Sequence, residues 1–194
     1  MAHFSDSGRW RTLGEKYLYE SPWCSFRLDE VRLPDGAEIE YGVLESAGFS
    51  AVVPVTEEGG VVLVRQWRQP VGGFTLELPG GGVDKEKDPR EAARRELLEE
   101  TGYRAEDLSH LVSVRTSPGR STEVCHLFRY KAVRQASGPR PEPTEFVSAV
   151  ELPLAAAVGK VYSGEITAAT SVLGLLMVSG EAAGGFAGES PRVH

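Results

Sequence analysis

Three glutamates near the middle of the chain have a spacing suited to binding a cation. Glu96, Glu99 and Glu100 stand at i, i+3 and i+4, so in a helix their carboxylates project from one face. Like charges at this spacing repel each other, and an isolated helix gains nothing from them. Carboxylate oxygens suit hard divalent cations such as Mg²⁺ or Mn²⁺, which also accept phosphate as a ligand. The simpler interpretation is a solvated acidic face.

A run of three glycines, Gly80 to Gly82, precedes the glutamates. Glycine lets a backbone approach phosphate groups closely, and the run offers a carbonyl oxygen as a ligand. Glycines and glutamates together therefore favour a metal–phosphate site over a solvated acidic face.

The helix that must position the glutamates has clear boundary signals. Asp88 suits the N-cap, Pro89 suits the first helical position, and Glu91 completes a capping box. Gly102 suits a left-handed stop at the other end. The apolar residues between these ends are Ala92, Ala93, Leu97 and Leu98. The sequence therefore predicts a helix from Asp88 to just before Gly102.

The stretch from Gly81 to Tyr103 resembles the Nudix box of nucleoside-diphosphate-X hydrolases. The resemblance is most specific in residues 95–103, which read RELLEETGY. The family has a glutamate where this chain has Lys87, and Glu86 is one residue out of register. In the family that glutamate supports the arginine of the box and the outer metal shell. Lys87 therefore bears on the rate and on the number of metal ions.

The resemblance implies metal-dependent hydrolysis of the diphosphate bond of a nucleoside-diphosphate sugar. The expected reaction converts ADP-ribose to AMP and ribose 5-phosphate. The implied ligands of Mg²⁺ (or Mn²⁺) are the Gly80 carbonyl, Glu96, Glu99 and Glu100, with Glu99 shared or bound through water. Arg95 would orient the glutamates, and it could also pair with Glu91 or Glu99 on the helix surface.

The resemblance also places a catalytic base on a later loop, just before the chain returns to a strand. A carboxylate there could take the proton of the attacking water. Glu145 matches this placement best, and Glu142 is the second candidate.

Substrate-binding candidates lie on both sides of the box. Arg68 and Glu77 are on the approach to Gly80, and the paired N–H donors of an arginine there could hold a diphosphate. Arg65 competes for that role, and a surface salt bridge is the alternative for either arginine. Beyond the box, Pro118 resembles a marker of the ADP-ribose branch, although Pro-Gly is also a common turn. The neighbouring candidates for lining the pocket are Ser117, Gly119 and Glu123.

The elements around the box predict an α+β fold. Strand-like segments at Lys16–Glu20, Trp23–Leu33 and Ala37–Leu44 predict a small N-terminal antiparallel sheet with a turn at residues 34–36. Further strands are expected at 49–55, 61–66, 74–78, 111–116, 124–133 and 146–152, and helices at 154–162 and 167–178. Together with the resemblance, this pattern predicts an α/β/α sandwich with a mixed sheet. Residues 134–145 should form a long exposed loop.

The expected organisation is an N-terminal segment at 1–45, a hydrolase domain at 46–180 and a disordered tail at 181–194. Three strands cannot bury both of their faces alone. The resemblance implies that they help to form a homodimer, and the alternative is an edge extension of the main sheet.

Composition limits the other possibilities. The 194 residues are 41% hydrophobic, and a net charge of −7 argues against binding a nucleic acid polymer. Cys24 and Cys125 have no metal-ligand spacing, so we expect two buried thiols in a reducing compartment. Because no signal peptide or long apolar run is present, a cytoplasmic protein with no membrane partner is expected.

Two other functions remain open. A nucleotide-sugar sensor that binds without turnover is favoured by Lys87. A Nudix-like isomerase or house-cleaning nucleoside triphosphatase is opposed by the N-terminal sheet and by Pro118.

Overall fold

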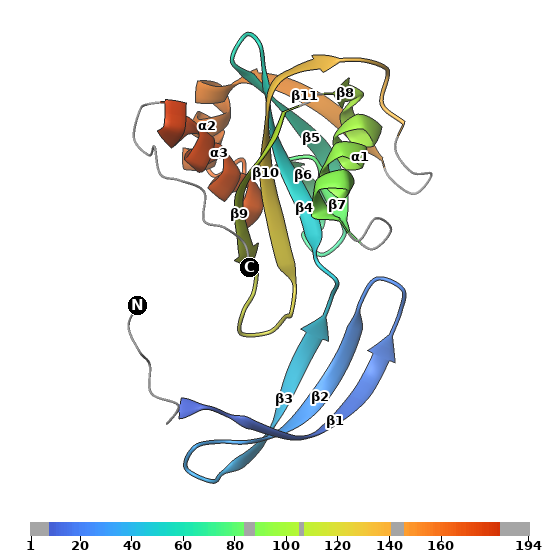
Figure 1. The fold of residues 1–194 in the computed structure, drawn as a ribbon, viewed down its shortest axis with the longest axis vertical. Helices are drawn as coiled ribbons and strands as arrows, with labels where there is room; N and C mark the ends of the chain where they lie inside the picture. Colours follow the sequence, from blue (N-terminus) through green and yellow to red (C-terminus); the bar gives the residue numbers. More distant parts are fainter. Residues whose placement is uncertain (1–7, 84–87, 105–106, 141–145, 183–194) are drawn as a thin grey trace. The chain divides into compact units, whose positions relative to one another are not determined.

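The computed structural model describes residues 8–83, 88–104, 107–140 and 146–182, apart from the side chains at 132 and 134 (Figure 1). The chain divides into two compact units. The first contains the residues up to Ala47 together with Ser117–Glu123, and the second contains Gly48–Thr116 and the chain from Val124 onward.

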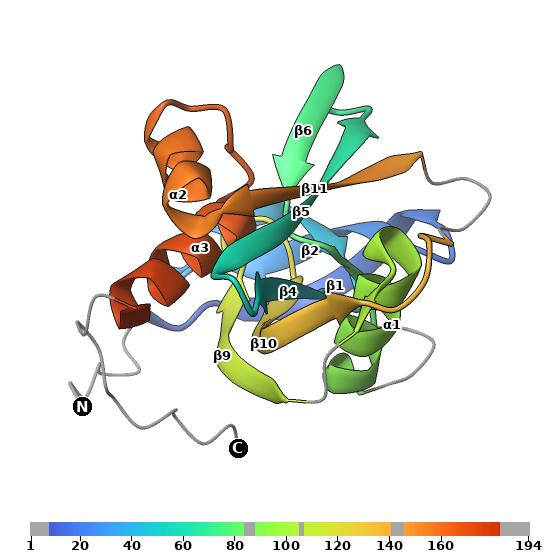
Figure 2. The same ribbon diagram turned by 90° about the horizontal axis from the view of Figure 1, so that it is seen from above.

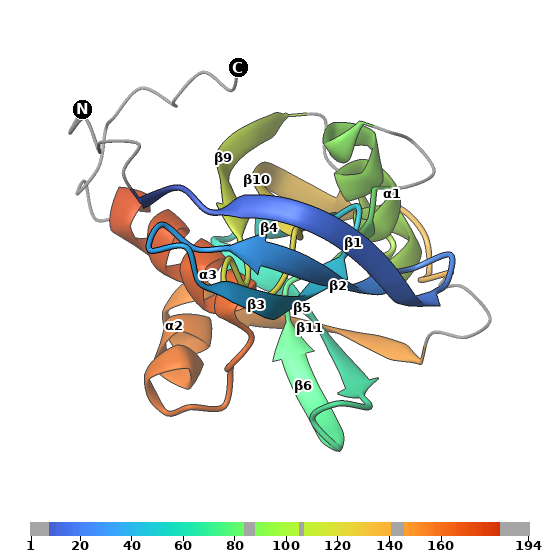
Figure 3. The ribbon, with the colours of Figure 1, turned by 90° about the horizontal axis from the view of Figure 1, so that it is seen from below.

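The first unit is a three-stranded antiparallel sheet (Figure 3). Its strands, in spatial order, are β1 (Arg11–Glu20), β2 (Ser25–Arg32) and β3 (Glu38–Glu45). Gly36, at a φ of 89°, turns the chain between β2 and β3, and its N–H donates to the Leu33 carbonyl at 3.0 Å. The segment Ser117–Glu123 joins β3, because the Leu44 N–H donates to the Arg120 carbonyl at 2.9 Å. The predicted separate N-terminal sheet is therefore confirmed.

The second unit is built on a mixed sheet that has eight strands within the described residues. The strands are β4 (Phe49–Thr56), β5 (Gly60–Arg68), β6 (Gly73–Glu77), β7 (Gly80–Gly82), β8 (Tyr103–Arg104), β9 (Leu108–Arg115), β10 (Val124–Gln135) and β11 (Val147–Pro153). The main path runs β11-β5-β4-β10-β8, with β6 beside β5, β7 beside β4 and β9 beside β10. β4 and β10 pair in parallel and the other pairs are antiparallel, which makes the sheet mixed.

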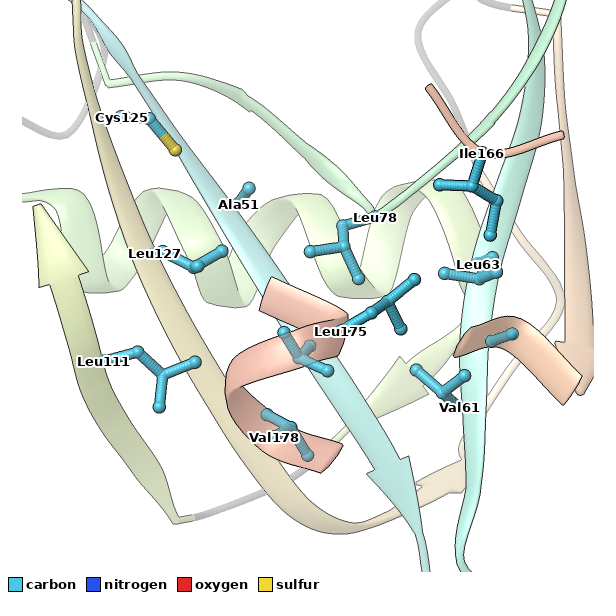
Figure 4. Packing of buried hydrophobic residues seen from close by; sticks show 12 residues of the cluster. Ala51, Val61, Leu63, Leu78, Leu111, Cys125, Leu127, Ile166, Leu175 and Val178 are labelled. Carbon is cyan, nitrogen blue, oxygen red and sulfur yellow. The ribbon is translucent and has the colours of Figure 1, made fainter. Parts of the chain in front are cut away.

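Helices cover both faces of this sheet (Figure 2). They are α1 (Pro89–Thr101) on one face, and α2 (Leu154–Tyr162) and α3 (Ala169–Ala182) on the other. Successive residues of a strand point to opposite faces, so Val52 packs with Leu97 of α1 whereas Val53 packs with Leu175 of α3. Figure 4 shows part of the core on the α3 side. The predicted mixed sheet between helices is confirmed.

Several element boundaries differ from those predicted. α3 continues to Ala182, so the first two residues of the predicted disordered tail are helical, and Glu181 in this last turn forms an ion pair with Arg129 of β10. β10 continues to Gln135, into the predicted loop, because it pairs with β8. β7 and β8 had no local signal, since both exist only through pairing with β4 and β10.

Two expectations about thiols and membranes can be compared with the structure. Neither cysteine, both of which the structure describes, is in a disulfide. Cys125 is buried as expected, but Cys24 is only half-buried, because it lies in the tight turn between β1 and β2. None of the helices in the described part of the chain has the length and apolar character needed to cross a membrane.

Candidate active site

The helix α1 has the boundaries that the sequence predicts. The Asp88 carboxylate accepts a hydrogen bond from the Arg90 N–H at 2.9 Å, and Pro89 opens the helix. Gly102 ends it at a φ of 76° and donates its N–H to the Leu98 carbonyl at 2.8 Å. A Cβ at Gly102 would lie 2.1 Å from the Ser137 carbonyl oxygen, so both the backbone angle and the space require glycine.

The same helix carries Glu96 and Glu100 into the protein against the glycine run. Their residues are 5% and 2% exposed, so the interpretation as a solvated acidic face is wrong for these two glutamates. The Gly80 N–H donates to Glu100 Oε2 at 2.9 Å. A Cβ on Gly81 would lie 2.2 Å from Glu96 Oε1, so a side chain there would displace the carboxylate. The glycine run therefore lies directly against the acidic face.

Arg95 joins two of the three glutamates. Its Nη1 lies 2.8 Å from Glu96 Oε1 and 2.9 Å from Glu99 Oε2, and its Nη2 donates to the Gly82 carbonyl at 3.2 Å. Glu91, the other partner considered for Arg95, forms an ion pair with Arg94. Arg95 thus has the contacts needed to orient Glu96 and Glu99. Its contact with Glu99 is also the i,i+4 ion pair that was considered as the alternative role.

The donor set around the glycine run consists of carboxylate and carbonyl oxygens, which suits Mg²⁺ or Mn²⁺. Within the described ranges, no three His, Cys, Asp or Glu side chains converge closely enough to hold an ion as they stand. The carboxylates of Glu96 and Glu100 face Arg95 and the Gly80 N–H. The residues thus fit a hard cation in chemistry, and binding one would require them to exchange some of these protein contacts for the ion.

Arg68 and Glu77 form a two-point ion pair close to the glycine run. Arg68 donates from Nε to Oε1 at 3.2 Å and from Nη2 to Oε2 at 2.8 Å. Burial of Glu77 opposes ionisation, but hydrogen bonds from Arg68 and Thr75 outweigh this effect and lower the pKa of Glu77. Glu77 is therefore a charged partner that fixes the guanidinium of Arg68.

The two candidate arginines lie on opposite faces of the sheet. Arg68 is two residues beyond Gln66, which shares the α1 side of β5 with Val62. Arg65 is the residue next to Gln66 in the strand, so its side chain points to the other face, on the side of α2 and α3. There its guanidinium carbon is 3.7 Å from the centroid of the Phe74 ring. Of the two, Arg68 shares a face with the helix that carries the glutamates.

Several predicted residues cannot be placed relative to these groups. Glu142, Glu145 and Lys87, with Glu86, lie outside the described residues. Ser117, Gly119 and Glu123 belong to the first unit, so their place in the pocket stays a prediction.

Two polar residues that touch this region carried no recognisable sequence signal. Ser50 Oγ donates to the carbonyl of Pro89 at 2.7 Å, at the start of α1. Thr75 Oγ1 donates to Glu77 Oε1 at 2.5 Å. A serine or threonine within a strand is common, and only the pairing of distant segments reveals these contacts.

Comparisons with known proteins agree with the geometry. The NUDIX domain family matches residues 47–170, and the nucleoside diphosphate sugar hydrolase N-terminal domain matches residues 10–44. The methanol dehydrogenase activator of Bacillus methanolicus is 34% identical over 145 residues, covering 74% of this chain and 78% of that protein. The ADP-ribose pyrophosphatase of Bacillus subtilis is 31% identical over 157 residues, covering 80% of this chain and 85% of that protein.

A solved structure described as an ADP compounds hydrolase has the same fold, with a TM-score of 0.78 at 20% identity, over 92% of this chain and 97% of that chain. The family match covers well over half of the chain and includes the capped helix with its buried glutamates. The chain therefore belongs to the Nudix hydrolases, among the nucleoside-diphosphate-sugar hydrolases that carry this N-terminal domain.

Proposed function

We propose that this Nudix hydrolase cleaves the diphosphate bond of ADP-ribose, releasing AMP and ribose 5-phosphate. The observation that carries the proposal is the pair of buried glutamates, Glu96 and Glu100, packed against Gly80 and Gly81. The name of the Bacillus subtilis relative supports ADP-ribose as the substrate.

Mg²⁺ is the proposed cofactor, with Mn²⁺ as a substitute. Glu96, Glu100 and the Gly80 carbonyl would hold it, with Glu99 as a shared ligand. When bound, the ion would act as a Lewis acid on the diphosphate. Arg95 would keep the carboxylates of Glu96 and Glu99 oriented, since its Nη1 is within 2.9 Å of both.

The remaining roles are assigned to residues around this centre. Arg68, held at two points by Glu77, would bind the diphosphate. Glu145 is proposed as the base, with Glu142 second. Arg65 is the weaker candidate for the substrate, because it stacks on Phe74 on the other face of the sheet.

A homodimer is the proposed assembly. On one face of the N-terminal sheet, Tyr19 is opposite Phe26, and Phe26 is opposite Leu44. These residues are 57%, 38% and 42% exposed, and they form an apolar row across all three strands. A three-stranded sheet with such a row is the kind of surface that a second copy can cover.

A panel of nucleotide sugars tests the proposed reaction. The purified protein is incubated with Mg²⁺ and ADP-ribose, ADP-glucose, GDP-mannose or UDP-glucose, and nucleoside monophosphate release is measured. ADP-ribose should give the highest kcat/KM. A preference for another nucleotide sugar would contradict ADP-ribose as the substrate but would still support hydrolysis as the reaction. Tight binding with no turnover would support a sensor.

Lys87 is the feature that favours a sensor, because the family has a glutamate there. A lysine in place of the glutamate at this position of the box should disfavour a full metal complement, so activity should need high Mg²⁺. Lys87→Glu should lower the Mg²⁺ concentration at half-maximal activity. Overlapping Mg²⁺ titrations of the two proteins would show that the replacement has no functional consequence.

A further inference from the structure

Helix α3 contacts the segment that leads into the glycine run, although it lies on the opposite face of the sheet from α1. The contact is made by Ser171, which is 1% exposed. Its Oγ accepts a hydrogen bond from the backbone N–H of Leu78 at 2.9 Å. Leu78 follows β6 directly and stands two residues before Gly80.

The side chain of Leu78 is held by the same helix. Gly174, one turn after Ser171, has no Cβ, and one placed there would lie 2.8 Å from Leu78 Cδ1 and from Val53 Cγ2. The absence of a side chain at Gly174 is what lets α3 come this close. Figure 4 shows Leu78 beside the α3 segment that carries Leu175. Ser171 and Gly174 thus fix both the backbone and the side chain of Leu78.

The chain from Leu78 to Gly80 is also fixed on its other side. The Pro79 carbonyl accepts from the Val52 N–H at 3.0 Å, and the Gly80 N–H donates to Glu100 Oε2 at 2.9 Å. A Cβ on Gly80 would lie 2.3 Å from the Ser50 carbonyl oxygen, so the backbone of Gly80 lies tightly against β4. With consecutive residues bound in this way, a shift at Leu78 has to be absorbed by Pro79 or by Gly80.

We infer that Ser171 is a positioning residue for the cation centre: through Leu78 it sets the position of the Gly80 carbonyl relative to the Glu100 carboxylate. The inference rests on the proposed role of Gly80 and Glu100 as ligands. It also gives α3, which carries none of the three glutamates of the site, a part in holding the centre. Groups that orient metal ligands at one remove commonly change metal affinity by about 10- to 100-fold when they are lost.

A purely structural role for Ser171 makes a different prediction. Removing the Oγ leaves a buried N–H without its acceptor, which lowers stability wherever it occurs. A structural role would therefore lower stability and leave metal affinity unchanged. Metal affinity measured on the folded protein separates the two possibilities.

The experiment measures Mn²⁺ binding by calorimetry on the full chain without substrate, and the Mg²⁺ concentration at half-maximal hydrolysis. Ser171→Ala should weaken Mn²⁺ binding by about tenfold and raise the Mg²⁺ requirement to match. KM for the nucleotide sugar at saturating Mg²⁺ should not change. Two controls lie on the same helix: Ser179→Ala repeats the substitution away from Leu78, and Val178→Ala removes core volume. Both should bind Mn²⁺ like the wild type.

If Ser171→Ala does not fold, Ser171→Cys replaces it, because a thiol is a weak acceptor of similar size. That variant should bind Mn²⁺ more weakly than the wild type. If a folded Ser171 variant binds Mn²⁺ with wild-type affinity, the inference is overturned and the proposed function stands. The same conclusion follows if Val178→Ala loses as much Mn²⁺ affinity as the Ser171 variant does. A wild-type protein that neither binds Mn²⁺ nor hydrolyses nucleotide sugars would overturn both.

Discussion

Glu96 and Glu100 are charged side chains in a buried position, where a carboxylate is costly unless it has a partner. Arg95 and the Gly80 N–H supply partners within 2.9 Å. Groups of this kind are concentrated at functional sites, because chemistry requires charge that folding alone would not place there. The burial of these glutamates, more than their number, separates the site from an ordinary acidic helix.

Replacing one of these carboxylates should remove activity and keep the fold. In Glu100→Gln the amide oxygen can still accept from the Gly80 N–H, so the melting temperature should stay close to that of the wild type. Turnover should fall by more than about 100-fold, because even mutation of a residue that only orients a metal ligand can lower activity by that factor. Glu96→Gln should behave alike. Nucleotide-sugar hydrolysis and a thermal melt measure the two effects.

Glu91→Gln is the matched control, because Glu91 is on the same helix and pairs with Arg94 on its exposed side. It should keep full activity. A rate like that of the wild type in Glu100→Gln at saturating Mg²⁺ would refute its assignment as a ligand.

The two candidate bases can be separated by kinetics. Glu145→Gln should lower kcat by about 10²- to 10⁴-fold with little change in KM, because a base acts mainly in the transition state. Glu142→Gln should do much less, since it lies three residues earlier with Pro143 between. Steady-state kinetics of both variants decide the assignment, and the reverse order of effects would move the role to Glu142.

At the level of elements, β9 and β10 share a chain of three polar side chains that contact one another. His110 Nε2 and His126 Nδ1 each lie 2.9 Å from Ser113 Oγ. Burial lowers the pKa of both histidines, and the nearby Arg90 lowers that of His110 further. Ser113 has one hydroxyl proton, so the chain is satisfied when the histidines are neutral.

This arrangement predicts that the stability of the second unit falls on mild acidification. The unfolded chain binds protons on both histidines near the ordinary pKa of about 6.5, whereas the folded chain binds them only at lower pH. The unfolded state therefore holds more protons in that window, and the free energy of unfolding decreases as the pH falls through it. Urea unfolding at pH 7.5 and pH 5.5 should show the loss.

The variant His110→Gln/His126→Gln should show a smaller difference between the two pH values. The range lies above the usual pKa values of carboxylates, including the lowered pKa of Glu77, so acid groups contribute little to it. If the variant and the wild type lose the same free energy of unfolding between the two pH values, the effect belongs to other groups.

For the whole molecule, the proposed dimer depends on the apolar row of Tyr19, Phe26 and Leu44. Sedimentation at micromolar concentration should give a dimer for the intact chain. Phe26→Glu should give a monomer, because a charge in the centre of the row would have to be buried without a partner. Tyr162→Glu is the control, since Tyr162 is also exposed but lies on α2. A monomeric wild type would contradict the dimer.

Much of the site could be predicted from sequence because its signals are local. The cap at Asp88, the stop at Gly102 and the spacing of Glu96, Glu99 and Glu100 all lie within one helix, whose periodicity determines which side chains share a face. The strand-like runs and the Gly36 turn are likewise properties of short segments. These signals predicted the mixed sheet, the separate N-terminal sheet and the family.

Only the tertiary structure decided which distant residues meet. It paired Arg68 with Glu77, placed Arg65 on the opposite face beside Phe74, and brought Arg95 of α1 to the Gly82 carbonyl of β7. The pairing of β7 with β4 and the contact of Ser171 with Leu78 join segments that are far apart along the chain. Such contacts depend on strand register and on close packing between layers, which no single stretch of sequence specifies.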